Sequence, residues 1–130
     1  MNFLDTNFLI DLLRGKVDDD DLLDELDRNG PHVTNTIVQF EFLFGGYNSK
    51  RSDEVDKRKS LLKKMIILPV DERSADEAAK LGSALKNKGE SIGNADCLIL
   101  GTMISHKIDT IITKNVKHFT KIAKIIVRSW

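Results

Sequence analysis

The chain opens with Met1-Asn2-Phe3-Leu4-Asp5-Thr6-Asn7-Phe8-Leu9-Ile10, in which an apolar run leads to a carboxylate and a second apolar run follows it. The first run predicts a short buried strand over about 2–5, and the second predicts a helix over about 7–14. Asp5 then lies at the carboxyl end of a strand, where open parallel α/β sheets bind their ligands. Because no basic residue is near it in sequence, this carboxylate needs a cation or a proton.

The rest of the chain alternates the same two patterns. Further strands are expected at about 32–34, 65–70, 110–113 and 125–127, and helices at about 18–29, 36–46, 52–65, 72–88 and 93–106. Gly45-Gly46 is expected to close the helix over 36–46, and Ser52 to cap the one over 52–65. Strands alternating with helices predict an α/β fold with a mainly parallel sheet covered on both faces. At 130 residues, we expect one domain over 1–130.

The charges balance overall but are unevenly distributed. Lysine plus arginine equals aspartate plus glutamate, 20 against 20, so net charge does not indicate a nucleic-acid binder. Residues 17–28 hold seven acids and one base, whereas residues 107–130 hold six bases and one acid. This asymmetry favours a basic face about as much as it favours an ordinary solvated surface.

The single cysteine, Cys97, rules out an internal disulfide, and its apolar neighbours favour a small buried filler over a catalytic thiol. A reducing cytoplasm fits this composition. The N-terminus has no basic region followed by a long apolar one, and no apolar run approaches the roughly 20 residues of a membrane span. We therefore expect a cytoplasmic protein without a membrane segment.

Two more acids lie in apolar surroundings, Glu41 in Val38-Gln39-Phe40-Glu41-Phe42-Leu43 and Asp96 in Ala95-Asp96-Cys97-Leu98-Ile99. Each is weak alone, since an aspartate at a helix start is usually an N-cap. Glu41 is stronger, because a carboxylate between Phe40 and Phe42 is not expected on a solvated face. Together with Asp5 they predict one divalent-metal site, because Mg²⁺ and Mn²⁺ prefer oxygen ligands and serve phosphodiester hydrolysis.

Four segments then occur in order: Leu4-Asp5-Thr6-Asn7, Glu41 with Leu43-Phe44-Gly45, Ile92-Gly93-Asn94-Ala95-Asp96-Cys97-Leu98-Ile99, and Thr113-Lys114-Asn115-Val116-Lys117-His118-Phe119. They resemble the motifs of PIN-domain ribonucleases and, more narrowly, those of the VapC-type toxins of prokaryotic toxin–antitoxin pairs. The resemblance covers essentially the whole chain. It implies a three-layer α/β/α sandwich and RNA cleavage with Mg²⁺ or Mn²⁺. It also implies three partners: RNA, a cognate antitoxin and a second copy of the chain.

The resemblance also implies residue roles. Asp5, Glu41 and Asp96 take the places of the metal-binding acids, and the fourth acidic place falls on Asn115, which supplies no charge. Asn7 and Thr113 would orient carboxylates or water; the alternatives are helix capping for Asn7 and an ordinary strand residue for Thr113.

Basic and aromatic residues receive less specific expectations. Lys114 and Lys117 would border the Asn115 end of the site, where they hold RNA phosphates or form an ordinary surface. The three histidines, His32, His106 and His118, are expected at the surface or at helix caps. The aromatic residues of the helix over 36–46 and just after it, Phe40, Phe42, Phe44 and Tyr47, are expected in the core or on a dimer surface.

Other functions remain open from the residues alone. A PIN-fold protein that binds RNA or protein without cutting is kept open by Asn115. A receiver-like phosphorelay module needs adjacent acids at the first strand tip, and this chain has Thr6-Asn7 there. A haloacid-dehalogenase-type phosphatase needs Asp-x-Asp, and Asn7 occupies the third position.

Overall fold

The computed structural model describes residues 1–130, and its centre is a five-stranded sheet in which every neighbouring pair is parallel. The strands are β1 (Asn2–Leu4), β2 (Val33–Asn35), β3 (Ile66–Leu68), β4 (Thr110–Ile112) and β5 (Ile126–Arg128). Their order across the sheet is β3-β2-β1-β4-β5. The chain therefore builds the sheet outward from β1 in one direction and later returns to β1's other side. That makes the β1/β4 junction a topological switch point, where such sheets bind ligands.

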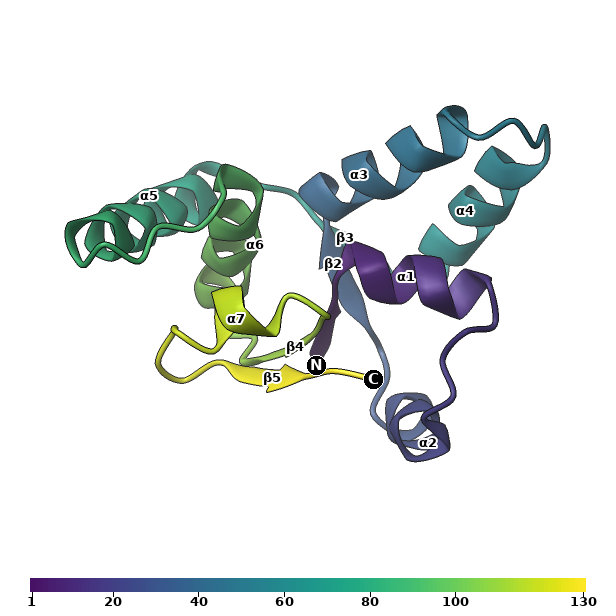
Figure 1. Ribbon diagram of the computed structural model, residues 1–130, viewed down its shortest axis with the longest axis horizontal. Helices are drawn as coiled ribbons and strands as arrows, with labels where there is room; N and C mark the ends of the chain where they lie inside the picture. Colours follow the sequence, from purple (N-terminus) through teal and green to yellow (C-terminus); the bar gives the residue numbers. More distant parts are fainter.

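Seven helices connect and cover the strands: α1 (Thr6–Leu13), α2 (Asp20–Arg28), α3 (Thr36–Tyr47), α4 (Glu54–Leu62), α5 (Glu72–Asn87), α6 (Asn94–Ser105) and α7 (Val116–Phe119). Figure 1 shows α5 and α6 on one side of the strands and α1, α3 and α4 on the other. The predicted α/β/α sandwich with a parallel sheet is confirmed. None of the helices combines the length and the apolar character needed to cross a membrane.

The core lies between the sheet and these helices. The central strands are buried because they are covered on both faces, and Phe3, Leu4, Ile111 and Ile112 are all at most 1% exposed. Cys97 is also buried, as expected for a filler, and burial raises the pKa of its thiol. Strands and helices predicted from periodicity are all present, with ends shifted by a few residues.

Two local expectations were wrong, and one short helix was not predicted. Gly45-Gly46 does not end α3, which continues to Tyr47. These glycines instead make room for a side chain of α4, because a Cβ at Gly46 would lie 2.9 Å from Cδ of Arg58. Ser52 does not cap α4, which begins at Glu54 after Asp53. Helix α7 was not predicted, since its four residues are too few to show a helical period.

Candidate metal centre

Asp5 lies where the sequence predicted it, directly after β1. Its extended backbone ends the strand, and its side chain caps α1 by accepting a hydrogen bond from the backbone N–H of Thr6 at 2.8 Å. The other carboxylate oxygen accepts a 2.6 Å hydrogen bond from the Thr113 hydroxyl. The residue is only 3% exposed. Two donors from different elements therefore hold this carboxylate in one orientation.

Thr113 follows β4, the strand that pairs with β1 across the switch point. Because Leu4 is in register with Ile112, the next residues of the two strands, Asp5 and Thr113, also lie side by side. The Thr113 hydroxyl accepts a hydrogen bond from the backbone N–H of Asn115 at 3.0 Å while it donates to Asp5. Thr113 is thus more than a β-branched strand residue: it connects Asp5 to the start of α7, where Asn115 stands.

Glu41 reaches the site from α3, where its Oε1 accepts a 2.8 Å hydrogen bond from the Thr6 hydroxyl. Thr6 therefore connects Glu41 to Asp5. The sequence argument that Glu41 is not on a solvated face was wrong, because the residue is exposed. Phe40 before it is also exposed, at 65%, whereas Phe42 after it is fully buried. Successive residues of a helix point about 100° apart, so two flanking phenylalanines do not imply a buried carboxylate.

Asp96 lies in the first turn of α6 but does not cap it. Gly93 occupies the cap position without a side-chain bond, and Asp96 Oδ2 lies 2.6 Å from Nδ1 of His118, at α7. His118 does lie at the surface as expected, with 45% of its side chain exposed, but its bond to a candidate metal ligand was not expected. His106, in contrast, does end α6 as its C-cap residue.

The other two acids act on the charge of Asp5. Burial raises the pKa of Asp5 above its usual value. Repulsion from Asp96 and Glu41 acts in the same direction, while the hydrogen bonds from Thr113 and Thr6 oppose it. Neither Asp5 nor Glu41 forms an ion pair with a lysine or arginine. No lysine or arginine therefore offsets the charge of these two carboxylates, while Asp96 faces the ring of His118.

The side chains do not form a closed set of three metal-ligating groups as they stand. Glu41 is bonded to Thr6 and Asp96 to His118. The chemistry of the donor set nevertheless fits a hard divalent cation, since it consists of carboxylate oxygens that no lysine or arginine pairs with.

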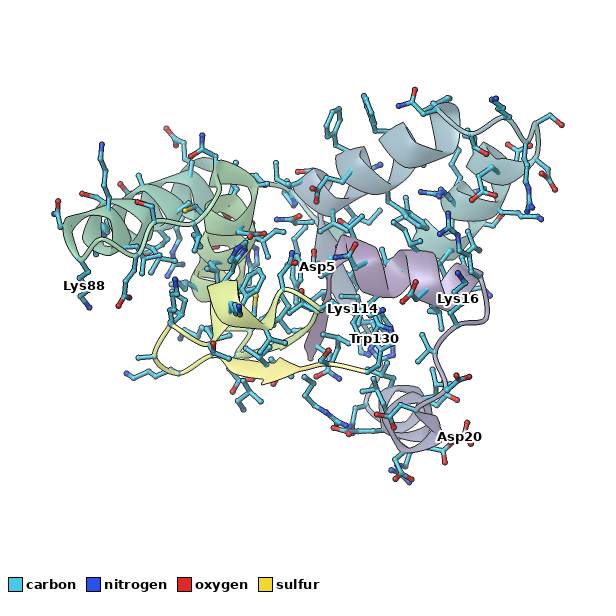
Figure 2. All side chains as sticks on the ribbon, viewed as in Figure 1. Asp5, Lys16, Asp20, Lys88, Lys114 and Trp130 are labelled. Atoms are coloured by element: carbon cyan, nitrogen blue, oxygen red, sulfur yellow. The ribbon has the colours of Figure 1, made fainter.

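The remaining predicted residues, Asn7, Lys114 and Lys117, differ in the contacts that they make with the rest of the protein. Asn7 is exposed and its side chain forms no hydrogen bond; the capping interpretation is wrong because Asp5 caps α1. Lys114 is paired with Asp11 at 2.8 Å and lies 5.0 Å from the ring centroid of Trp130 (Figure 2). Lys117 is exposed and forms no ion pair. Of the two lysines, only Lys117 is free to meet an anion.

Sequence reasoning missed two contributors to the site, Thr6 and His118. Thr6 was quoted only as part of a motif, although its place next to Asp5 at the first helical position was a usable signal. His118 stands three residues after Asn115, which is one helical turn, so a helix starting at Asn115 would have placed both at the same edge.

Comparisons with known proteins identify the family of this chain. The sequence model of the PIN domain family matches residues 3–125. The chain is 30% identical over 120 residues to the protein named Ribonuclease VapC19 of Mycobacterium tuberculosis, covering 92% of each chain. It is 28% identical over 109 residues to Ribonuclease VapC2 of Rickettsia felis, covering 83% of this chain and 81% of the relative.

Two solved structures extend the likeness to the whole fold. VapBC2 from Rickettsia felis, bound to a DNA fragment from their promoter, matches with a TM-score of 0.86 and 27% identity, over 99% of this chain and 98% of that chain. VapBC-1 from nontypeable Haemophilus influenzae matches with a TM-score of 0.84 and 25% identity, over 99% and 97%.

Proposed function

This chain belongs to the PIN domain family, and we propose that it is an endoribonuclease that depends on Mg²⁺ or Mn²⁺ and acts as the toxin of a toxin–antitoxin pair. The observation that carries the proposal is Asp5, a buried carboxylate at the topological switch point with two more acids acting on it and no lysine or arginine paired with it. The names of the relatives, both ribonucleases, support the reaction class.

Asp5, Glu41 and Asp96 would hold the cation, and Asn115 would offer an uncharged oxygen beside them. When bound, a divalent cation activates a water and offsets the charge that grows on the scissile phosphate. Because Asn115 adds no charge, we propose that three carboxylates carry the metal affinity of this site.

The chain's other residues position these groups. Thr113 and Thr6 donate to Asp5 from two sides, which leaves the carboxylate little freedom to rotate. Thr6 also donates to Glu41, so the same residue sets the spacing of two ligands. We propose that Lys117 meets an RNA phosphate near Asn115, and that Asn7, without a protein partner, contacts water or RNA at the mouth of the site.

We propose an antitoxin and a second copy of this chain as protein partners. The solved relatives are VapBC structures. On this chain, Phe40, Phe44 and Tyr47 of α3 are each at least 56% exposed, an apolar surface that a protein partner would cover. We further propose that residues 1–130 act as one nuclease domain in the cytoplasm, since one cluster of 20 buried residues runs through the fold.

A non-cleaving PIN-fold protein that binds RNA or another protein is the second candidate. Two observations favour it: the uncharged Asn115, and the occupation of Asp96 Oδ2 by His118. Membership of the PIN domain family leaves no support for the receiver-like and phosphatase interpretations.

One experiment separates cleavage from binding alone. A 5′-labelled single-stranded RNA is incubated with the purified chain in Mg²⁺, in Mn²⁺ and in excess chelator. We expect cleavage in either metal and none in chelator. Binding without cleavage under all three conditions would establish the second candidate, and cleavage that persists in chelator would exclude the metal-dependent reaction.

A further inference from the structure

A polar pocket lies at the opposite ends of the two helices that carry Thr6 and Glu41. It has a volume of about 570 Å³ and lies between the end of α1 and the turn from α3 to α4. Five of its ten lining residues are basic, Arg14, Lys16, Arg51, Lys57 and Arg58, and one is acidic, Glu54. In a chain whose net charge is zero, this is a strong local concentration of positive charge.

The floor of this basic pocket is a buried guanidinium. Arg58 is 4% exposed, and its Nε donates to Glu54 at 3.0 Å. Its Nη1 donates to the backbone oxygen of Phe42 at 2.7 Å, and Nη2 has no acceptor in the protein. The space for this side chain exists only because residues 45 and 46 are glycines, whose added Cβ atoms would lie within 3.0 Å of it.

The rim of the basic pocket consists of unpaired cations. Arg14 follows the last residue of α1, Lys16 lies two residues beyond it, and Arg51 lies in the turn before α4. All three are exposed, and none forms an ion pair, whereas Lys57 is paired with Asp53. Figure 2 shows Lys16 at the far end of α1 from Asp5. Glu54 offsets the charge of Arg58, so the positive charge available to a phosphate comes from the three free cations, with Nη2 of Arg58 as a further donor. A phosphate accepts several such charge-assisted bonds.

The position of the pocket relates it to the acidic site. The eight residues of α1 span about 12 Å at 1.5 Å per residue, with Asp5 before the first and Arg14 after the last. On α3, Glu41 and Asn48 are separated by seven residues, or about 10 Å. A nucleic-acid backbone held at the acids can therefore reach the pocket within a few nucleotides.

We propose that the basic pocket binds a backbone phosphate of single-stranded RNA outside the scissile bond, an inference that rests on the proposed ribonuclease function. A protein segment fits less well, because only one of the ten lining residues is hydrophobic and protein interfaces have apolar centres. The exposed aromatic residues of α3 line a different pocket.

The test compares two matched double variants. Lys16→Gln/Arg51→Gln removes two exposed rim cations, and Lys86→Gln/Lys88→Gln removes two exposed lysines at the end of α5, neither of which lines the basic pocket (Figure 2 labels Lys88). Binding of a fluorescent 12-nucleotide single-stranded RNA is measured by anisotropy over a salt series, in a Glu41→Gln background that slows cleavage. Thermal melts check that each variant folds.

The expected result is a roughly fivefold or greater loss of RNA affinity for the pocket variant. The slope of log K against log salt should also fall by about 0.7 for the one lost phosphate contact, with no change for the α5 control. With Glu41 restored, cleavage should show a raised KM and a kcat within about twofold.

Four other outcomes would contradict the pocket proposal or the proposed function, and they can be told apart. If the pocket variant binds RNA with the same affinity and slope as the control, the pocket proposal is overturned while ribonuclease activity stands. If it keeps its RNA affinity but loses affinity for a 12-residue polyglutamate peptide, the pocket binds acidic protein instead, which also overturns the proposal. If the unmodified chain binds RNA without cutting it, the proposed function fails, and the salt slope still decides the pocket. An absence of RNA binding would overturn both.

Discussion

Two regions at opposite ends of α1 and α3 differ in how their charges are held. At the acidic end, Asp5 is buried and bonded to Thr6 and Thr113, and Glu41 is bonded to Thr6. At the basic end, Lys16 and Arg51 are exposed and unpaired, whereas Arg58 is buried and held by two hydrogen bonds.

The difference teaches what each region can do. A reaction needs ligands held in one geometry, which the carboxyl ends of buried strands provide. Holding a polyanion needs positive charge in the right place, and cations on turns provide that without fixed side chains. The acidic end should therefore be sensitive to single substitutions, and the basic end tolerant of them.

The largest expected effect is at the acidic end. Asp5→Asn and Glu41→Gln keep side-chain shape but remove ligand charge, and each should lower the RNA cleavage rate at least ~100-fold, or about 2.7 kcal/mol of transition-state stabilisation. Asp27→Asn, which removes an exposed acid of α2, serves as the control and should cleave normally. Single-turnover cleavage measures all three. Retained activity in either site variant would remove the distinction between the two ends.

Metal removal should lower the melting temperature only when the acidic end is intact. A ligand that binds only the folded state adds about 2.7 kcal/mol at a concentration of 100 Kd, so Mg²⁺ or Mn²⁺ should raise the melting temperature of the wild type. Asp96→Asn should respond much less. Without metal it should melt close to the wild type, because removing one negative charge near Asp5 offsets the lost bond to His118.

A calorimetric titration supplies the control for this experiment. The protein is stripped of metal with a chelator and moved into chelator-free buffer before Mg²⁺ or Mn²⁺ is titrated in. Asn115→Asp, which adds a carboxylate, should bind the metal more tightly than the wild type. Equal metal responses in wild type and Asp96→Asn would place the cation away from Asp96.

A substitution beneath the basic pocket should reduce stability without touching the acids. In Gly46→Ala the new Cβ would lie 2.9 Å from Cδ of Arg58, a side chain already held by two hydrogen bonds. We expect a loss of about 1–3 kcal/mol of unfolding free energy from this overpacking. Urea unfolding measures it, with Gly93→Ala as the control, where a Cβ meets nothing within 4 Å and the loss should stay below about 1 kcal/mol. Equal losses would show that Arg58 can shift freely.

The smallest expected effect concerns the ion pair of Asp11 with Lys114, which belongs to neither region. Hydrogen bonds from Lys114 and from the indole of Trp130 lower the pKa of Asp11 below its usual value of 3.8. A lowered carboxylate pKa gives stability that is present above the unfolded pKa and lost as pH falls through the folded pKa. Asp11→Asn should therefore lower the unfolding free energy by less than about 1 kcal/mol at neutral pH. It should have no effect at a pH below both the folded and the unfolded pKa of Asp11.

The fluorescence of Trp130, the only tryptophan, reports this loss in melts at neutral and strongly acidic pH. Asp27→Asn again serves as the control. A difference between wild type and Asp11→Asn that persists in acid would mean that the Asp11 side chain contributes packing rather than charge.

Much of the fold and part of the site could be predicted from sequence because the signals were local. An apolar run before Asp5 indicates a strand tip, and the placement of Asp96 two residues inside a helix follows from the segment around it. The wrong expectations were also local: Gly45-Gly46 resembles a helix end, and Glu41 resembles a buried residue, when each neighbourhood is read without its partners.

The contacts that could not be predicted join residues far apart in the chain. Thr6 and Glu41 are 35 residues apart, and Asp96 and His118 are 22 apart. No pattern in a short window contains both members of such a pair. The buried position of Arg58 is similar, since it depends on two glycines of α3. Their role becomes visible only when α4 is packed against α3.

The sequence by itself determined the alternation of strands and helices, the strand-tip position of Asp5 and the kinds of ligand at hand, because backbone periodicity and side-chain chemistry are properties of neighbouring residues. Only the tertiary structure decided which groups hold those ligands and where the free cations gather. Register between β1 and β4 brings Thr113 to Asp5, and the packing of α4 on α3 buries one arginine beneath exposed ones. Those distances depend on how elements pack, and packing is a property of the whole chain.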